Sequence, residues 1–202
     1  MTKQFHDNHL SAEALDQIFR EARSYNGWHD KEVSDDQIHA IHELLKMGPT
    51  SANMQPGRFV WCKSQEARDK LAEFASEGNK EKIKTAPVVV IIGYDIDFHE
   101  ELPWLFPHTD AKSWFEGDEE GRKEGAKRNS ALQGAYLMIA ARALGLDCGP
   151  MSGVDLDKIT GHFFADSPRH RADWVCAIGY GDKTTIFDRS PRPDFDKFNT
   201  IA

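Results

Sequence analysis

The chain has 202 residues, which fits one domain spanning 1–202, because a single core of this size should bury roughly 70% of the surface of the unfolded chain. Hydrophobic residues make up 40%, aromatic residues 10% and charged residues 29%, and this composition excludes disordered and collagen-like classes. The net charge of −8 argues against nucleic-acid binding, which needs clustered lysine and arginine, so we expect small-molecule ligands.

Two amphipathic helices are predicted near the N-terminus. Ser11 has the character of an N-cap and is followed by apolar residues at helical spacing as far as Ala22. Ser34 and Gln37 have the spacing of a capping box, which opens a second helix that ends at Gly48. The apolar positions of this second helix are expected to face the core: Ile38, Ile41, Leu44 and Leu45.

The next segments alternate between strands and helices. Strands are predicted at 58–62 and 87–92 with a helix at 67–75 between them, and the continuous apolar run at 87–92 indicates a strand that is buried on both faces. Residues 95–118 have no consistent period and carry several aromatic residues among prolines. We interpret this segment as a lid-like insertion.

Residues 122–144 are predicted to form one long helix. Its second half, from Ala131 to Ala140, is apolar on nearly every side, which is typical of a helix buried all round. In a chain of this size such a helix is most easily buried between subunits, which indicates a homodimer. A strand is predicted at 174–178, and the proline-rich tail at 189–193 should be extended.

The sequence does not support several classes of protein and of functional site. The first ten residues have no apolar stretch, and no apolar run is long enough to span a bilayer, so we expect a soluble, cytoplasmic protein without membrane association. The three cysteines, Cys62, Cys148 and Cys176, are widely spaced and predict buried thiols rather than a disulfide framework. The sequence has no signature of a hydrolase, nucleoside triphosphatase or zinc protease, and no metal site is expected.

The segment Gly48-Pro-Thr-Ser-Ala-Asn-Met-Gln-Pro56 is the most informative part of the sequence. Its short donors and acceptors suit the edge of a polar heterocycle, although a well-capped turn explains them equally well. This loop resembles the P-[ST]-S-x-N-x-Q-P element of the flavin-dependent nitroreductase family. Four further elements follow in the order of that family: an Arg/Ser segment at 22–28, Asn-x-x-Lys at 79–82, a Gly-Pro-Met-Ser-Gly loop within 143–153, and a basic tail at 189–193.

This resemblance implies a fold and an activity. The fold class would be α+β, with a central, mostly antiparallel sheet flanked by helices and the long helix at a dimer interface. The activity would be that of a flavoprotein that takes hydride from NADPH or NADH onto FMN and passes it to a small oxidised substrate. Both subunits of the homodimer would contribute to each FMN site.

The resemblance also implies cofactor contacts for individual residues. Arg23, Arg189 and Arg192 match positions that bind the phosphate, and guanidinium groups suit phosphate oxygens. Hydrogen bonds to the phosphate, the ribityl chain and the ring edge are implied for Ser24, Asn26, Thr50, Ser51, Asn53 and Asn129.

Lys82 is the residue expected to tune the flavin. A cation beside the N1/O2 edge of the ring would favour its reduced form, and Asn79, three residues earlier, would brace the same edge from the same helical face. Lys80 and Lys84 support the competing interpretation that this lysine-rich stretch is only a solvated face, and the spacing from Asn79 selects Lys82. No side chain is expected to act as an acid–base catalyst, because the hydride transfer would occur at flavin N5.

Pro150, Met151, Ser152 and Gly153 would pass along the flavin ring, with a backbone N–H near Ser152 or Gly153 directed at N5. Two departures from the family pattern are visible. Ser152 stands where many members carry Glu, so proton supply would come from solvent or from the insertion. Ala22 stands where many members have a first Arg.

Within the family, the chain most resembles the malonic semialdehyde reductase branch of the Rut pathway of pyrimidine degradation, which shares the Asn-Gly-Trp start, the Leu-Phe-Pro-His insertion and the Gly-Pro-Met-Ser-Gly loop. Reduction of malonic semialdehyde to 3-hydroxypropionate would then be the reaction. A broad nitroaromatic or quinone reductase and a non-enzymatic flavin-binding protein are the alternatives. Candidates for binding a substrate carboxylate are Arg58, Lys112 and Arg128, and the sequence does not select between NADH and NADPH.

Overall fold

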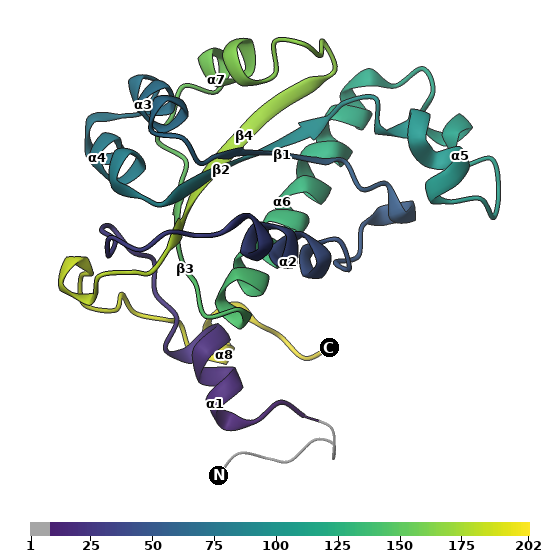
Figure 1. Cartoon of the computed structure of the whole chain (residues 1–202). Coiled ribbons are helices and arrows are strands. Elements are labelled where there is room, and N and C mark those ends of the chain that lie inside the picture. Colours follow the sequence, from purple (N-terminus) through teal and green to yellow (C-terminus); the bar gives the residue numbers. More distant parts are fainter. Residues whose placement is uncertain (1–8) are drawn as a thin grey trace.

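The computed structural model describes residues 9–202. Most of the first ten residues, whose sequence argues against a targeting segment, lie outside this part. Four antiparallel strands form one sheet in the order β1-β2-β4-β3 (Figure 1). The strands are β1 (Gly57–Cys62), β2 (Val88–Asp95), β3 (Asp147–Met151) and β4 (His170–Gly179). The principal helices are α2 (Asp35–Leu45), α3 (Gln65–Glu73), α4 (Glu77–Thr85), α6 (Glu119–Ala143) and α7 (Leu156–Phe163). The predicted α+β class with a central antiparallel sheet is confirmed.

Helices cover both faces of the sheet (Figure 1). Val88, Val90 and Ile92 of β2 pack against the layer formed by α2 and α6, whereas Val89 and Ile91 pack against the layer formed by α3, α4 and α7. Side chains alternate between the two faces of a strand, so a central strand between two helical layers must be apolar at every position. The prediction that 87–92 is buried on both faces is confirmed.

The N-terminal helices start as predicted, with one error in their burial. The Ser11 side chain accepts a hydrogen bond from the Ala14 N–H, and Ser34 and Gln37 form the reciprocal capping box of α2. The first helix is short: α1 (Ala12–Leu15) continues as a π-helix, Asp16–Arg20. Leu44 was predicted to face the core but is 44% exposed, because Ile41 and Leu45 already define the buried stripe of α2.

The long helix α6 forms as predicted, but it is not buried on every side within one chain. Asn129, Leu137 and Ala141 are buried, whereas Leu132 and Tyr136 are 48% and 38% exposed. These two apolar side chains therefore face outward from the single chain. The dimer interface remains a prediction. Among the described residues, no helix combines the length and the hydrophobicity that a bilayer crossing requires.

The segment 95–118 contains three short helical turns: Phe98–Glu101, α5 (Leu102–Leu105) and Lys112–Phe115. Phe98 and Leu102 pack with Met54 and Ala126 in a third, separate core cluster. The insertion therefore lies against α6 and the loop that precedes β1, at the opposite end of the molecule from α4 (Figure 1). Whether it acts as a lid remains a prediction.

Candidate functional site

The loop between α2 and β1 has strained backbone geometry. Ala52, Asn53 and Gln55 all have positive φ, at 47°, 48° and 39°. Residues other than glycine rarely adopt this region, and such outliers persist only where the surrounding contacts determine them. The accumulation of three in four residues marks this loop as the most constrained backbone in the described part of the chain.

Polar contacts hold the strained loop against α6. The buried Asn129 side chain accepts from the Ser51 N–H at 2.8 Å and donates to the Gly125 carbonyl at 2.9 Å. The Thr50 hydroxyl accepts from the Gln55 N–H at 3.1 Å. Asn129 and Thr50 therefore shape the loop, and the predicted cofactor residues Thr50, Ser51, Asn53 and Asn129 form one local group.

A second group lies where β3 ends beside α4. The Asn79 side chain donates to the Gly153 carbonyl at 3.1 Å. A Cβ at Gly153 would lie 2.7 Å from Asn79 Nδ2, so a larger residue at this position would force the Asn79 side chain to move. Lys82 is half-buried further along α4, whereas Lys80 pairs with Glu77 at 2.7 Å. The structure thus ties Lys80 to a surface ion pair.

The predicted loop at 143–153 is partly wrong, because Asp147–Met151 is strand β3. Among the described strands, β3 pairs with β4 and lies at the edge of the sheet, which is compatible with Pro150 because proline has no N–H to donate. The Pro150 side chain is exposed, whereas Met151 is buried in the core. Ser152 and Gly153 follow the strand as exposed residues. Pro150 and Ser152, rather than Met151, are therefore the side chains that this edge exposes.

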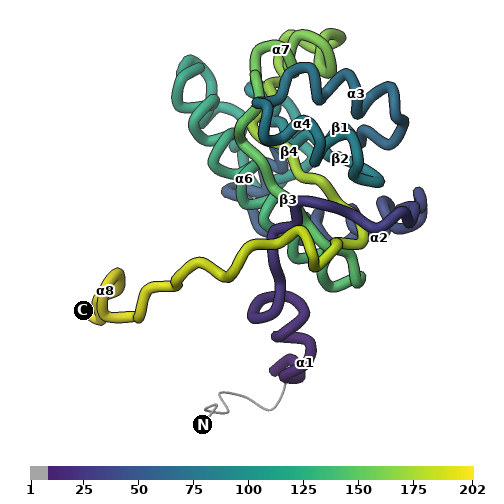
Figure 2. The backbone as a smooth tube through the Cα atoms, turned by 90° about the vertical axis from the view of Figure 1, so that its left-hand side faces the viewer, coloured from purple at the N-terminus to yellow at the C-terminus, as the bar shows by residue number. Residues whose placement is uncertain are grey.

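A third group joins the N-terminal segment to the tail. Arg23 donates through Nη2 to the Phe187 carbonyl, Asn26 donates to the Thr185 carbonyl at 2.9 Å, and Arg189 donates to the Arg20 carbonyl at 2.7 Å. Arg192 contacts only carbonyls of its own segment among the described residues. The tail is extended, as predicted, and projects away from the body of the chain (Figure 2).

The second and third groups are connected through β3. Ser24 forms a parallel bridge with Cys148, and the Tyr25 N–H donates to the Cys148 carbonyl at 3.0 Å. The edge strand thus runs from the Arg23 segment towards Gly153 and Asn79. No hydrogen bond joins either group to the 50–55 loop within residues 9–202. A single chain therefore brings the predicted site residues together in two places rather than one.

A buried ion cluster at the end of β2 was not predicted. Asp95 is 1% exposed and accepts from Arg58 at 2.7 Å and from Arg169 at 2.8 and 2.7 Å. Burial alone would raise the pKa of this carboxyl, but hydrogen bonds from Arg169 and the Asp97 N–H and the positive charges of both arginines outweigh it, so the pKa is lowered. Arg58 is therefore committed to a structural ion pair.

The other two candidates for a substrate carboxylate are also paired. Lys112 contacts Glu100 at 2.7 Å, and Arg128 contacts Glu124 one helical turn away on α6. Both pairs are solvent-exposed, where an ion pair contributes little and a competing anion can displace it. The structure does not single out a cation for this role.

The three cysteines are free and buried, as predicted. Burial raises the pKa of Cys62 to about 12, which keeps it in the unreactive thiol form. Among the described residues, no group of three or more His, Cys, Asp or Glu side chains is arranged to hold a metal ion.

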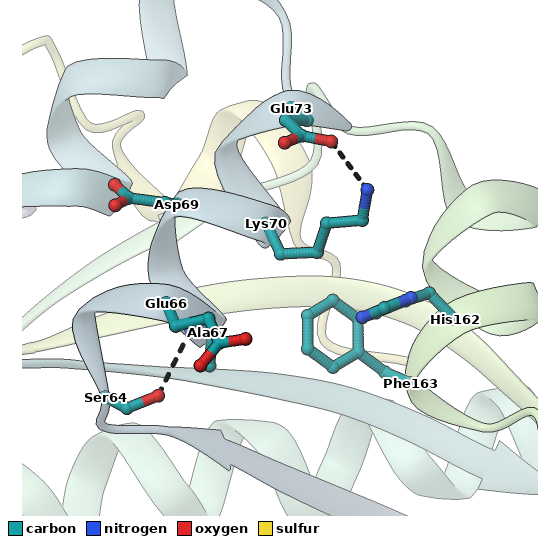
Figure 3. A pocket seen from close by; sticks show the side chains of 8 residues that line it. All are labelled: Ser64, Glu66, Ala67, Asp69, Lys70, Glu73, His162 and Phe163. Atoms are coloured by element: carbon teal, nitrogen blue, oxygen red, sulfur yellow. Dashed lines mark hydrogen bonds and ion pairs between the residues drawn. The ribbon is translucent and has the colours of Figure 1, made fainter.

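Two cavities bear on the location of a site. One of about 650 Å³ lies between α3 and α7 and is lined by Lys70, Glu73, His162 and Phe163, but by none of the predicted site residues (Figure 3). Another, of about 490 Å³, is lined by Asn53, Gln55 and Arg58 together with Trp104 and Leu105 of α5. The second cavity is the one that adjoins the strained loop and the insertion.

Known structures with the same fold were found by comparison. A chain of Bacillus subtilis described as a nitroreductase superposes with a TM-score of 0.84 at 18% identity, over 95% of this chain and 100% of that one. A second, from Exiguobacterium sibiricum and solved in complex with FMN, gives a TM-score of 0.83 at 21% identity, over 96% and 99% of the two chains. At these identities the likeness establishes the fold.

Relatives with higher identity and a family model establish the family. A Stenotrophomonas maltophilia protein, provisionally named NADH dehydrogenase/NAD(P)H nitroreductase, is 54% identical over 193 residues, which are 96% of this chain and 98% of that protein. A Ralstonia nicotianae protein with the same provisional name is 49% identical over 188 residues, 93% of this chain and 96% of its own length. The model of the nitroreductase family matches residues 1–182. The chain therefore belongs to the nitroreductase family.

Proposed function

We propose that the protein is an FMN-dependent NAD(P)H oxidoreductase whose cofactor site is completed by a second copy of the chain. The pairing of Asn79 with Gly153, with Lys82 on the same helix, is the observation that carries the proposal. Family membership and the FMN complex of the Exiguobacterium sibiricum protein support the cofactor. The names of the relatives support NAD(P)H as the hydride donor.

The available donor groups fit a flavin mononucleotide. Its phosphate is dianionic, and this chain of net charge −8 gathers Arg23 and Arg189 beside Ser24 at the start of the edge strand. At the other end of the strand, Ser152 and Gly153 are exposed. The separation of the 50–55 loop from both groups supports a site shared by two subunits, in which the loop of one copy faces the edge strand of the other.

FMN, when bound, supplies the ring atom that accepts hydride from the nicotinamide and delivers it to the substrate. Lys82 would hold a positive charge beside the ring edge that becomes negative on reduction, and Asn79 would orient that edge. Ser152 supplies no carboxylate, so the proton that completes the reduction would come from water. The residues of the chain bind and orient, and none is assigned as an acid–base catalyst.

Malonic semialdehyde, reduced to 3-hydroxypropionate in pyrimidine degradation, is the substrate we propose. The Leu-Phe-Pro-His insertion and the Gly-Pro-Met-Ser-Gly loop support this choice. A broad nitroaromatic or quinone reductase is the second candidate, and the names of the relatives favour it. An enone reductase shares the fold with a TM-score of 0.83 at 19% identity, so the fold itself does not choose the substrate.

The purified protein is expected to carry a visible flavin band that NADPH or NADH bleaches under anaerobic conditions. Malonic semialdehyde should then restore the band, and its kcat/KM should exceed that of a nitroaromatic or quinone, because specificity lies in this ratio. A higher ratio for the nitroaromatic would select the second candidate. Absence of a flavin band after incubation with FMN would refute the proposed cofactor, and a flavin-bound monomer by light scattering would refute the shared site.

Replacing Lys82 by Met is expected to lower the midpoint potential of the bound flavin by roughly 20–60 mV, which corresponds to about 1–3 kcal/mol for a two-electron couple. The physical reason is the loss of the cation that would stabilise the reduced ring. Lys80→Met is the matched control, because Lys80 lies on the same helix but pairs with Glu77. Equal potentials in the two variants would remove Lys82 from the site.

A further inference from the structure

A chain of three side-chain amides connects α6 to the insertion. Gln133 of α6 is 4% exposed, and its Oε1 accepts from the Gly57 N–H at 2.7 Å. Its Nε2 donates to Gln55 Oε1 at 2.7 Å, and Gln55 Nε2 donates to Asn53 Oδ1 at 3.0 Å. Asn53 Nδ2 then donates to the backbone carbonyl of Leu105 in α5 at 2.8 Å. We call this the amide relay.

The direction of the amide relay is fixed at both ends. The Gly57 N–H can only donate and the Leu105 carbonyl can only accept. Each amide between them has one donor end and one acceptor end, so the orientation of Gln133 determines that of Gln55, which in turn determines that of Asn53. The assignment of oxygen and nitrogen in these side chains, which is otherwise ambiguous, follows from these two backbone groups.

The relay ends at a segment with few other polar links to the loop. Leu105 lies in α5, and the neighbouring Trp104 side chain is 70% exposed and donates to Glu101 of the same insertion. Asn53, Gln55, Trp104 and Leu105 all line the cavity of about 490 Å³. The bond from Asn53 to Leu105 is therefore a polar link between α5 and the strained loop at this cavity, beside the apolar cluster that contains Leu102 and Met54.

We propose that Gln133 and Gln55 are positioning residues that, through Asn53, latch the insertion onto the 50–55 loop and so set the opening through which substrate reaches the cofactor. Gln133 does not contact the insertion and acts only through the two intervening amides. The claim that this opening admits substrate rests on the proposed function. The latch itself does not depend on it.

Gln133→Glu tests the direction of the relay with almost no change in shape. The ionised carboxylate of this variant still accepts from the Gly57 N–H but cannot donate to Gln55. Gln55 must then turn its amide to donate, Asn53 must follow, and the Asn53 oxygen would face the Leu105 carbonyl. When the introduced carboxyl is protonated, its O–H donates again and the original direction returns. Burial raises the pKa of such a carboxyl, which brings this change into an accessible pH range.

Amide hydrogen exchange over 102–115 is the measurement, on the protein as purified and with protection compared with that of wild type at each pH. At pH 8 the Gln133→Glu variant should exchange roughly 2- to 10-fold faster there, the change expected for the loss of one ordinary hydrogen bond, that from Asn53 to the Leu105 carbonyl. At pH 5 protection should recover. Gln65→Glu is the control, because it adds the same charge on α3, where Gln65 donates to Asp69 and to the Lys84 carbonyl and not to the relay. The exchange rates of the amides at 102–115 should not change in this variant.

Gln55→Glu is the second variant, and serves if Gln133→Glu does not fold. It retains the acceptor for Gln133 but removes the donor to Asn53, so the same amides should lose protection at pH 8. Unchanged exchange in the variants that fold would overturn the latch. If Gln133→Glu loses amide protection at pH 8 and does not recover it at pH 5, the latch is also overturned, because local damage to α6 would give that result.

Flavin binding is scored separately from its absorbance. A missing flavin band with pH-reversible exchange would leave the latch standing and reject the cofactor. A flavin band that NADPH or NADH bleaches, together with unchanged amide exchange in the variants, would support the cofactor and reject the latch. With both present, the KM of the oxidising substrate should change more than kcat at pH 8, because the latch alters access rather than the chemistry at the ring.

Discussion

Asp95→Asn is expected to lower the free energy of unfolding by about 3–5 kcal/mol, the usual cost of removing one partner from a buried ion pair. The substitution preserves volume, so the loss comes from charge and hydrogen bonding. Arg169 donates twice to the Asp95 carboxylate and Arg58 donates once, and the side chain is 1% exposed. With Asn at this position, two guanidinium groups would face a neutral amide that can accept at only one atom.

Urea denaturation of the variant and of wild type measures this loss. Glu100→Gln is the matched control, because it removes the same charge from the exposed pair with Lys112 and should cost no more than about 1 kcal/mol. A difference between the two variants below about 1 kcal/mol would mean that the Asp95 cluster does not anchor the end of β2.

The same carboxyl gives a pH dependence with a definite sign. The pKa of Asp95 is lower in the folded protein than its ordinary value, so the carboxylate is stabilised by folding. Its contribution is therefore complete above the ordinary pKa of aspartate and is lost as the pH falls through the lower, folded value. The unfolding free energy of Asp95→Asn should accordingly decline less steeply with acidification than that of wild type.

The double variant Arg23→Ala/Arg189→Ala is expected to raise the Kd for FMN at least ~100-fold, since each hydrogen bond to a charged group contributes about 1.5–3 kcal/mol. Both arginines lie where the N-terminal segment meets the tail, and both would turn towards a phosphate that neutralises them. They also hold the tail at this place through their hydrogen bonds to backbone carbonyls, so their loss would remove the proposed phosphate donors and free the tail together.

Flavin fluorescence titration measures the Kd for FMN of wild type and of the double variant, each at two salt concentrations. Lys70→Ala/Lys158→Ala is the control: it removes the same two charges from the exposed surfaces of α3 and α7, and its Kd should stay within about threefold of wild type. Similar affinities for the two double variants would show that the phosphate lies elsewhere. A riboflavin affinity that falls as much as that of FMN would assign the loss to the tail rather than to the phosphate.

Local signals made much of the fold predictable. The capping box of α2 and the apolar run of β2 each depend on neighbouring residues, so their patterns are complete in the sequence. β3 was missed because a five-residue edge strand containing Gly149 and Pro150 has almost no strand propensity of its own. It forms because β4 provides a template of backbone donors and acceptors.

The sequence identified the segments that carry the candidate site residues, but not how those segments lie relative to one another. The resemblance pointed to Asn79 and to Gly153, and the structure joins them, yet nothing in the sequence indicates that the 50–55 loop should lie apart from them. The Asp95 cluster escaped prediction for a related reason. Its members come from β1, from β2 and from the residue before β4, and their spacing in the sequence has no period that a pattern could reveal.

The burial of the three thiols has a practical consequence. Cys62, Cys148 and Cys176 are the full complement of cysteines in the chain, and all are enclosed in the two sheet-facing cores. A new cysteine placed at the exposed Trp104 would therefore be the one thiol that a maleimide probe reaches in the native protein. The natural sequence can thus carry a single reporter dye on α5 without first being stripped of its own cysteines.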